Sequence, residues 1–336
     1  MDMKSTRDNN LNFMRFVAAI LVIICHSFPI CYGKSSADAL SNMTQELLNL
    51  GGVAVGFFFL IGGYLIAGSA ERKQRAVPFF KARIKRLFPS LIVVIVLSTF
   101  VLGPMLSKVS LKEYFTSGTT YRYLINMILI PQHFLPGVFE SNVYKGVVNG
   151  PLWTLPIEFV CYIGCFIMYK MGLFQKKKIL FLIPVVVVLE IISSIALADR
   201  PSYVWIIRPI FLFFTGIVFY VYRESLILKH QYTVLFLLAF IGLCIVKQST
   251  IAMLFCFPYI CFDLAFGWKG KLTTWRKKHE ISYGMYLWGW PVQQFLAMLG
   301  GYFLHWYVNA IVTVGIVSMI GLVNSIFIEN NKRLKG

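Results

Sequence analysis

Two ionisable residues, Arg15 and His26, interrupt the apolar segment NFMRFVAAILVIICHSF, which runs from Asn12 to Phe28. An ionisable side chain within a membrane costs about 3 kcal/mol, so we expect it to have a function. The two positions are 11 residues apart, and a helix places them on one face, about 16 Å apart along its axis. A cation and a titratable base on one face suit a long, thin ligand with a phosphate end and a reactive end. The alternative is an arginine that snorkels to the membrane surface and a histidine bonded to a neighbouring helix.

Glu158 is the residue that we expect to meet His26. It lies in the segment NGPLWTLPIEFVCYI, roughly 9 Å below the outer end of a predicted span. A carboxylate beside an imidazole holds its tautomer and stabilises the imidazolium that forms when it accepts a proton. The alternative is that Glu158 bonds backbone groups freed by Pro156. Other ionisable residues in predicted spans are Glu190, Arg208 and Asp263.

Arg83 and Arg86 lie in the segment FFKARIKRLFP, just before a predicted span. The guanidinium group offers a fork of hydrogen-bond donors that matches a phosphate group. These residues are therefore candidates for binding a phosphorylated ligand from the cytoplasm. A positively charged cytoplasmic loop, without any ligand, is the alternative interpretation.

The composition indicates that these residues are positioned by membrane-spanning helices. Of the 336 residues, 58% are hydrophobic and 14% are charged, whereas a soluble domain has about 25% charged residues. The formal net charge is +18, but the basic residues gather between apolar runs. We therefore expect cytoplasmic loops rather than a surface that binds nucleic acid. The sequence predicts one integral domain over residues 1–336, located in the plasma or inner membrane.

An all-α bundle of about ten transmembrane helices follows when the basic clusters are placed in the cytoplasm, and both termini are then cytoplasmic. The segment 121–139 is apolar but contains Pro131 and Pro136. If it crossed the membrane completely, Lys176–Lys178 would face outward, so we expect it to be re-entrant or interfacial on the outer side. The predicted spans lie near residues 12–30, 47–69, 87–107, 152–171, 179–197, 203–222, 233–246, 250–268, 281–300 and 306–328.

Five sequence elements together resemble the acyltransferase-3 family of integral membrane acyltransferases, which modify exported and surface glycans. The resemblance extends from the first predicted span to the ninth, and the elements occur in the order found in the family. They are Arg15 with His26; FFLIGGYLI at Phe58–Ile66; Arg83 with Arg86 ahead of Pro89; PLWTLPIEF at Pro151–Phe159; and ISYGMYLWGWP at Ile281–Pro291.

The resemblance implies a role for each matching residue. His26 would be the catalytic base, and Arg15 an essential partner on the same helix. Arg83 and Arg86 would belong to the cytoplasmic site for the acyl donor, which is usually acetyl-CoA in this family. Glu158 is assigned to the catalytic group, and the candidates for the substrate pocket are Tyr64, Trp153, Ser282 and Tyr283.

Two positions depart from the family pattern. Gly62 stands where the family often has serine, and its small size would allow closer helix packing. Gly289 stands where many members have a second histidine. A mechanism that requires that second imidazole is therefore in doubt for this chain, and His26 would carry more of the chemistry.

The predicted function is transfer of an acetyl group from cytoplasmic acetyl-CoA to a hydroxyl of an exported polysaccharide, such as a capsule, or of a lipid-linked precursor. Acetyl-CoA would be a substrate, and we expect no bound cofactor and no metal, because the seven cysteines show no metal-ligand spacing. A multi-pass transporter of a small anionic or glycan-related substrate is the first alternative. A non-catalytic partner in glycan assembly is the second.

Overall fold

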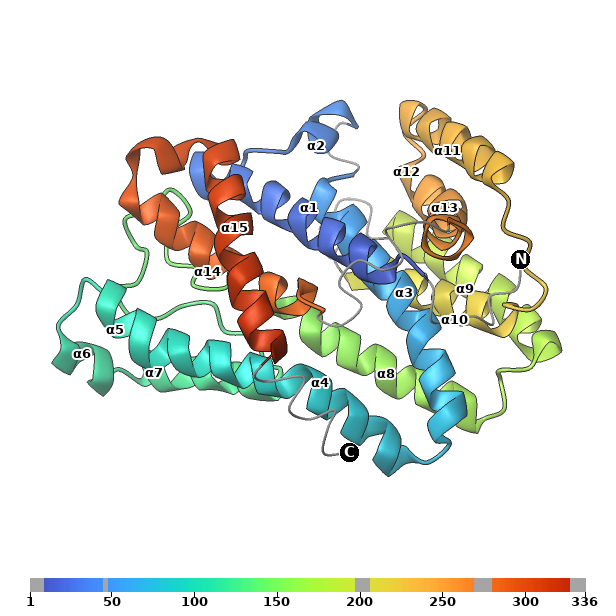
Figure 1. Cartoon of the computed structure of the whole chain (residues 1–336), viewed down its shortest axis with the longest axis horizontal. Coiled ribbons are helices and arrows are strands. Elements are labelled where there is room, and N and C mark those ends of the chain that lie inside the picture. The colour runs from blue at the N-terminus through green and yellow to red at the C-terminus, as the bar shows by residue number, and fades with distance from the viewer. Residues whose placement is uncertain (1–8, 45–47, 197–205, 269–279, 327–336) are drawn as a thin grey trace. The chain divides into compact units, whose positions relative to one another are not determined.

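The computed structural model describes residues 9–44, 48–196, 206–268 and 280–326, and it is helical throughout (Figure 1). Within these ranges the β-structure consists of two isolated bridges, Ser107 with Val138 and Phe134 with Val147. The predicted all-α class is confirmed. Both termini, with their predicted cytoplasmic location, and the basic segment Lys269–Lys278 lie outside the described residues.

Six helical stretches within the described ranges are long and apolar enough to cross a membrane, which makes the chain a multi-pass membrane protein. Four other predicted spans coincide with α9 (Lys176–Ala196), α10 (Arg208–Val221), α11 (His230–Ile245) and α14 (Ser282–Leu299). The count of ten spans stays a prediction. The six stretches are Leu11–Tyr32, Leu50–Lys73, Ala76–Leu106, Pro151–Lys170, Ser249–Gly267 and Trp306–Asn324.

The remaining helices are numbered in chain order. The long ones are α1 (Leu11–Tyr32), α3 (Leu50–Lys73), α4 (Ala76–Leu97), α8 (Thr154–Lys170) and α15 (Trp306–Asn324). The short ones are α2 (Ala39–Met43), α5 (Gly103–Leu106), α6 (Leu111–Thr116), α7 (Gly118–Arg122), α12 (Ser249–Ile251) and α13 (Phe257–Phe262).

The chain divides into two compact units, and both are discontinuous in sequence. Unit 1 comprises Met1–Ala18, Leu40–Phe79 and Ile157–Lys277. Unit 2 comprises Ala19–Ala39, Phe80–Pro156 and Lys278–Gly336. The helix α1 contributes to both units. That the two act as one functional domain stays a prediction.

Unit 1 is built around the close packing of α3 on α10. A Cβ atom on Gly63 would lie 1.9 Å from the carbonyl oxygen of Phe213, and one on Gly216 would lie 2.0 Å from that of Leu60. Glycine is required at both positions because the two backbones touch there. The expectation for Gly62 is corrected, since a Cβ there would meet the ring of Phe213 at an ordinary 3.6 Å.

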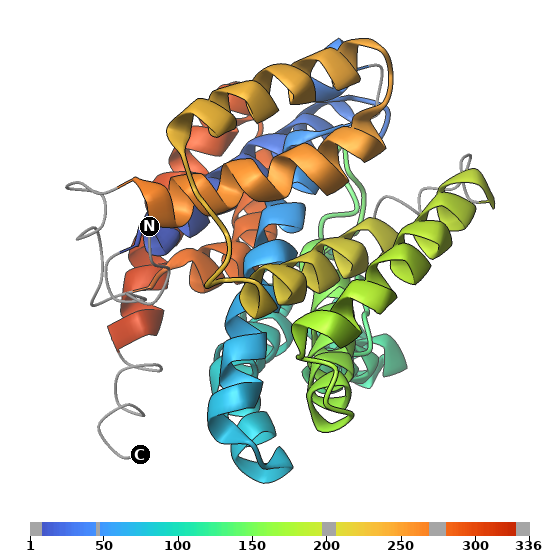
Figure 2. The ribbon, with the colours of Figure 1, turned by 90° about the vertical axis from the view of Figure 1, so that its right-hand side faces the viewer.

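A second helical pair completes unit 1. The helix α11 lies beside the helical stretch Ser249–Gly267, as Figure 2 shows. That stretch contains α13 between two π-helical turns, Ala252–Cys256 and Asp263–Gly267. Such turns widen a helix locally and often occur at functional sites.

Unit 2 contains the packed pair α14 and α15, together with α4 and a long connection between α7 and α8. This connection starts with a 3₁₀ helix, Tyr123–Ile128, and continues without helix to residue 150. The segment 121–139 therefore forms no helix of spanning length, in agreement with the prediction, and its depth in a membrane stays predicted. Its buried side chains, Tyr123, Leu135, Val138 and Phe139, share one apolar core with α4 and Leu287 of α14.

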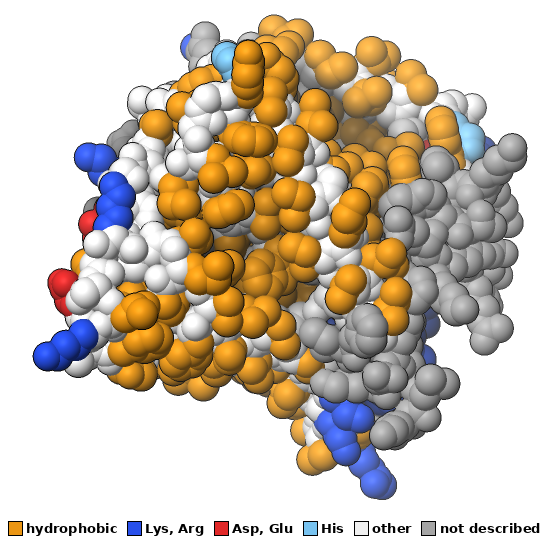
Figure 3. All heavy atoms as spheres, turned by 60° about the vertical axis from the view of Figure 1, so that its left-hand side comes forward, with side chains coloured by type: hydrophobic (Ala, Val, Ile, Leu, Met, Phe, Trp, Pro, Cys, Tyr) orange, Lys and Arg blue, Asp and Glu red, His pale blue; other side chains and the backbone are white. Residues whose placement is uncertain are grey.

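Large apolar side chains are exposed along the outer surface of α4 and its continuation. Ile92, Val93, Leu97 and Phe100 are each about 40% exposed, and Met105 is 74% exposed. Figure 3 shows a face on which hydrophobic side chains gather over the middle and charged side chains lie at the left and lower edges. An exposed apolar surface of this extent is expected where a protein contacts lipid.

Candidate active site

The helix α1 is unbroken from Leu11 to Tyr32, so Arg15 and His26 share one helix as predicted. Both side chains are half-buried. They belong to the face of α1 that also carries the buried residues Ala18, Val22 and Ile30. The helical placement is thus confirmed, whereas the roles of the two residues stay predictions.

His26 packs against the indole ring of Trp290 on α14. The two ring centroids are 5.0 Å apart and the planes are inclined by 73°. Trp290 is buried, and its Nε1 donates a hydrogen bond to the carbonyl oxygen of Val147 at 3.0 Å. A second aromatic ring, that of Tyr144, lies 5.1 Å from the indole. The imidazole therefore faces an aromatic wall whose orientation is fixed by a hydrogen bond.

The aromatic wall ends, on the side away from His26, beside a solvent-exposed residue. Lys34 follows α1, is exposed, and places its Nζ 5.2 Å from the centre of the Tyr144 ring. Burial raises the pKa of Tyr144, so its phenol is neutral at physiological pH. A chain of four side chains, from Lys34 through Tyr144 and Trp290 to His26, thus connects an exposed cation to the imidazole.

Side-chain amides hold the connection from Asn142 to Asn149 against α14. Gln294 Nε2 donates to the carbonyl oxygens of Tyr144 and Val147, at 2.8 and 2.9 Å. Asn142 Nδ2 donates to Gln294 Oε1 at 2.8 Å. These contacts fix the loop that carries the partners of Trp290.

Asn149 compensates for a proline in the middle of α14. Pro291 has no N–H group, which leaves the carbonyl oxygen four residues earlier, that of Leu287, without its helical donor. Asn149 Nδ2 donates to this oxygen at 2.9 Å. The turn of α14 next to Trp290 is thereby held from outside the helix.

The two arginines of the predicted phosphate site face inward from α4. Arg83 and Arg86 are half-buried, whereas Lys81 and Lys85 of the same basic run are exposed. If the basic residues only set the membrane topology, the arginines would not need to be more buried than the lysines beside them. Leu87 is fully buried, and its carbonyl oxygen accepts a hydrogen bond from Tyr283 Oη of α14 at 2.9 Å.

The helix α14 thus contacts three of the sequence elements that the resemblance joined. Tyr283 bonds α4 beside Arg86, and Trp290 meets His26 of α1. Between them, Tyr286 Oη lies 2.5 Å from Thr154 Oγ1 and also donates to the carbonyl oxygen of Pro151. Seven residues separate Tyr283 from Trp290, which corresponds to about 10 Å along the helix. The region around Arg83 and Arg86 is therefore about two turns of α14 away from the imidazole.

Two pocket candidates in unit 2 have defined local contacts. Ser282 is 4% exposed, and both its backbone N–H and its hydroxyl bond Glu280 Oε1, the former at 2.8 Å. This contact begins α14 and gives Ser282 a structural role. Trp153 is half-buried at the end of the 3₁₀ turn Pro151–Trp153. Their functions as pocket residues stay predictions.

Three other predicted residues, Arg15, Glu158 and Tyr64, belong to unit 1. Glu158 accepts a hydrogen bond from Tyr162 Oη one turn along α8. Tyr64 is 2% exposed and packs in an aromatic cluster with Tyr220 and Phe262, at centroid distances of 5.5 and 5.2 Å. These contacts give Tyr64 a core position. The predicted meeting of His26 with Glu158 stays a prediction.

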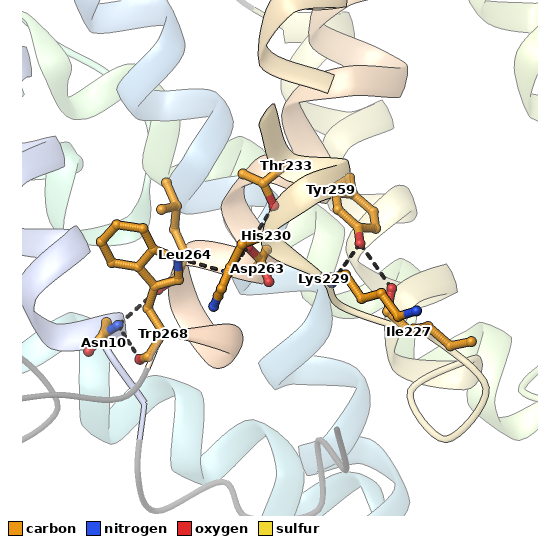
Figure 4. A network of polar contacts seen from close by, with 9 residues as sticks. All are labelled: Asn10, Ile227, Lys229, His230, Thr233, Tyr259, Asp263, Leu264 and Trp268. Carbon is orange, nitrogen blue, oxygen red and sulfur yellow. Dashed lines mark hydrogen bonds and ion pairs between the residues drawn. The ribbon is translucent and has the colours of Figure 1, made fainter. Parts of the chain in front are cut away.

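Asp263 heads a polar network within unit 1 (Figure 4). The carboxylate is completely buried; Oδ2 accepts a hydrogen bond from Thr233 Oγ1 at 2.6 Å and lies 2.8 Å from His230 Nδ1. Next to it, Asn10 Nδ2 donates to the carbonyl oxygens of Leu264 and Trp268, at 2.9 and 2.8 Å. All of these contacts lie within unit 1 and hold its helices or the residues next to their ends, which indicates a structural role.

The other ionisable residues of the spans also have defined places. Arg208 begins α10, is 5% exposed, and its NH2 donates to Thr250 Oγ1 at 3.3 Å. The side chain of Glu190 is not among those that the structure describes. Within the described part of the chain, no three His, Cys, Asp or Glu side chains lie close enough together to hold a metal ion.

Sequence reasoning did not select Trp290, Asn149 or Gln293 as site residues. Trp290 lies in a motif quoted for the resemblance, and its position before Pro291 was a usable signal. The partners of Asn149 and Gln293 lie 138 and 270 residues away in the chain. Nothing in the local sequence indicates contacts of that range.

Comparisons with known proteins agree with these observations. A family model described as an acyltransferase domain, that of the acyltransferase-3 family, matches residues 8–329. An O-acetyl transferase of Shigella phage Sf6 is 29% identical over 301 residues, which cover 86% of this chain and 85% of the relative. No solved structure matches.

Two further relatives match over shorter ranges. The acyltransferase MdmB of Streptomyces mycarofaciens is 27% identical over 48% of this chain and 39% of its own length. Nodulation protein 10 of Rhizobium leguminosarum bv. viciae is 29% identical over 46% of this chain and 42% of its own length. The transporter and the non-catalytic partner are thereby set aside in favour of an enzyme. Since the family model covers nearly the entire sequence, the chain belongs to the acyltransferase-3 family and is a membrane acyltransferase.

Proposed function

We propose that this enzyme transfers an acetyl group from cytoplasmic acetyl-CoA to a hydroxyl of an exported cell-surface polysaccharide or its lipid-linked precursor. The observation that carries the proposal is the pair of contacts made by α14. One joins it to α4 beside Arg86 and the other to His26. A donor with phosphates at one end and a thioester at the other matches such an arrangement, and the similarity to a phage O-acetyl transferase supports the acetyl group.

In the proposed reaction, His26 acts as the general base. Its imidazole takes the proton of the acceptor hydroxyl while the hydroxyl oxygen attacks the thioester carbon. The new C–O bond forms, the C–S bond breaks, and the imidazolium returns the proton to the departing thiolate. The products are the acetyl ester and free CoA. An acetyl-enzyme intermediate is the alternative route to the same products.

Arg83 and Arg86 are proposed to hold the phosphates of acetyl-CoA, with Arg15 as a further partner. Guanidinium groups bind phosphate oxygens in a bidentate manner. Their half-buried setting supports this role, because a partly desolvated cation binds an anion more strongly than an exposed one. Glu158 is proposed to orient the imidazole, as a carboxylate does in other base-catalysed acyl transfers.

The acceptor is proposed to approach from the outer side of the plasma membrane. His26 lies near the end of α1 that the predicted topology places outside, while Arg83 and Arg86 lie on the predicted cytoplasmic side. This division would allow a cytoplasmic donor to acetylate an exported glycan. Succinyl-CoA or another acyl-CoA would bind in the same way. The test described next therefore distinguishes acetyl-CoA from these donors.

The test uses purified full-length protein in liposomes with radiolabelled acetyl-CoA and a cell-surface polysaccharide. We expect label to appear in the polysaccharide as an alkali-labile ester, with one free thiol released per ester formed. NMR of the product then identifies the acylated hydroxyl. Accumulation of label inside the liposomes without ester formation would contradict the proposal, as would transfer from another acyl-CoA alone.

A further inference from the structure

Two adjacent glutamines on α14, Gln293 and Gln294, are completely buried but serve different parts of unit 2. Gln294 bonds the loop carbonyls of Tyr144 and Val147. Gln293 instead extends its Nε2 to α1, where it donates to the carbonyl oxygen of Ile23 at 2.8 Å. The same residue type at neighbouring positions therefore holds a loop in one case and the helix of His26 in the other.

Ile23 lies one turn before His26, and α1 contains a proline shortly after His26. Pro29 lies inside this helix and has no N–H group, so the carbonyl oxygen of Cys25 loses its helical donor. A proline in a helix interior also bends the helix at the preceding turn. The neighbouring carbonyl of Ile24 accepts a hydrogen bond from Ser27 Oγ at 2.7 Å. Side chains thus bond two successive carbonyls of the turn that leads to His26.

Gln293 is itself held in place from α15. Asn309, which is completely buried, donates from Nδ2 to the backbone carbonyl of Gln293 at 3.1 Å. On the same side of α14, a Cβ on Gly289 would lie 3.4 Å from Ile23 Cγ1, so α14 and α1 have little space between them there. A chain of contacts therefore runs from α15 through Gln293 to the backbone of α1.

A buried amide that serves packing alone is a poor choice for a membrane protein. An apolar side chain of the same length would fill the space without the cost of desolvating an amide. The amide of Gln293 instead makes a directional contact with one particular carbonyl. Gln293 therefore contributes a directional hydrogen bond, which an apolar side chain of the same size would not provide.

We propose that Gln293 is a positioning residue for His26. By bonding the carbonyl oxygen of Ile23, Gln293 fixes the turn of α1 that sets the direction of the His26 side chain. The indole of Trp290 packs against the imidazole ring and restricts its rotation. This inference rests on the proposed role of His26 as the base. A general base must lie within hydrogen-bond reach of the hydroxyl that it deprotonates, and a displacement of about 1 Å can cost about 100-fold in rate.

The test compares Gln293→Met with Gln294→Met, because methionine keeps the length of glutamine and removes its donors. In the acetyl-transfer assay, Gln293→Met is expected to lower kcat about 10- to 100-fold while KM for acetyl-CoA changes less than about twofold. Gln294→Met loosens the loop behind Trp290 but leaves the contact between α14 and the backbone of α1 in place, so its effect on kcat is expected to be at least threefold smaller than that of Gln293→Met. The midpoint of thermal unfolding in detergent should fall less in Gln293→Met, which loses one side-chain hydrogen bond, than in Gln294→Met, which loses three.

The inference is overturned if Gln293→Met keeps the wild-type kcat, or if both variants lose kcat equally. A Gln293→Met variant that does not fold is replaced by Gln293→Asn, whose amide is too short to reach Ile23 and which should show the same separation of kcat from KM. His26→Ala is assayed in parallel. If that variant remains active, the proposed function fails; if it is inactive and Gln293→Met is unaffected, only the present inference fails.

Discussion

The two units of this acyltransferase use buried polar groups in different ways. In unit 1, the buried carboxylate of Asp263 bonds other side chains, those of His230 and Thr233, although Asn10 of the same unit donates to backbone carbonyls. In unit 2, side chains mostly donate to backbone carbonyls of other elements, as in Tyr283 to Leu87, Asn149 to Leu287, Gln293 to Ile23 and Trp290 to Val147. Bonds of the second kind set the course of the backbone, which is what a helix carrying the proposed base would need.

Proline accounts for one of these bonds, that of Asn149 to the carbonyl oxygen of Leu287. Three helices that contribute to unit 2, α1, α4 and α14, contain an internal proline. Each proline removes a backbone donor and frees a carbonyl. The helices α3 and α10, which form the centre of unit 1, have none after the first turn and pack through Gly63 and Gly216 instead. The centre of unit 1 thus relies on close contact between helices without an internal proline, although α9 of the same unit contains Pro184.

The largest expected effect comes from comparing a histidine of each unit. His26→Ala should lower acetyl transfer by about 100- to 10,000-fold, which is the usual contribution of a general base. His230→Gln should leave transfer near the wild-type rate, because its described partners are structural. Both are measured with radiolabelled acetyl-CoA in liposomes. Equal activity of the two variants would remove the functional distinction between the units.

Next in size is the effect of a methyl group at the contact between α3 and α10. Gly63→Ala should destabilise the protein by about 3 kcal/mol, because the new Cβ would overlap the carbonyl oxygen of Phe213. Gly62→Ala should be tolerated, since its Cβ has room. The measurement is the midpoint of thermal unfolding in detergent. If both variants unfolded at the same temperature, close packing would not be the basis of unit 1.

A smaller effect is expected at the proposed donor site in unit 2. Arg83→Ala should raise KM for acetyl-CoA about 10-fold, which corresponds to about 1.4 kcal/mol. Lys85→Ala removes the same charge from an exposed position two residues away and should change KM less than twofold. Donor titrations at saturating acceptor provide both values. An unchanged KM in Arg83→Ala would end the proposed phosphate contact.

The smallest expected effect concerns the network of Figure 4. Asp263→Asn keeps an oxygen that can accept a hydrogen bond from Thr233 or His230 but removes the charge, so stability should fall by about 1 kcal/mol. The rate of transfer should stay within about twofold of the wild type. A large loss of transfer with normal stability would show that unit 1 contributes to chemistry through this network.

Particular residues show how far prediction from the sequence reached. The helix with Arg15 and His26 was predictable, because hydropathy over about 20 residues and a spacing of 11 do not depend on the rest of the chain. The arginines were also predictable, although their half-buried setting was not, since Lys81 and Lys85 lie in the same basic run. Tyr64 was selected by motif and lies in an aromatic core. The glycine that touches a neighbouring helix is Gly63 and not Gly62, a difference of one residue that hydropathy cannot resolve.

The sequence by itself determined that this protein is a helical membrane acyltransferase and which residues are candidates for its chemistry, because apolar length, spacing and ordered motifs are local properties. Only the tertiary structure decided what surrounds His26. Trp290, Asn149 and Gln293 act through carbonyls and rings that lie more than a hundred residues away in the chain. A backbone carbonyl is the same group in every residue, so no sequence pattern marks the one that a distant side chain will bond.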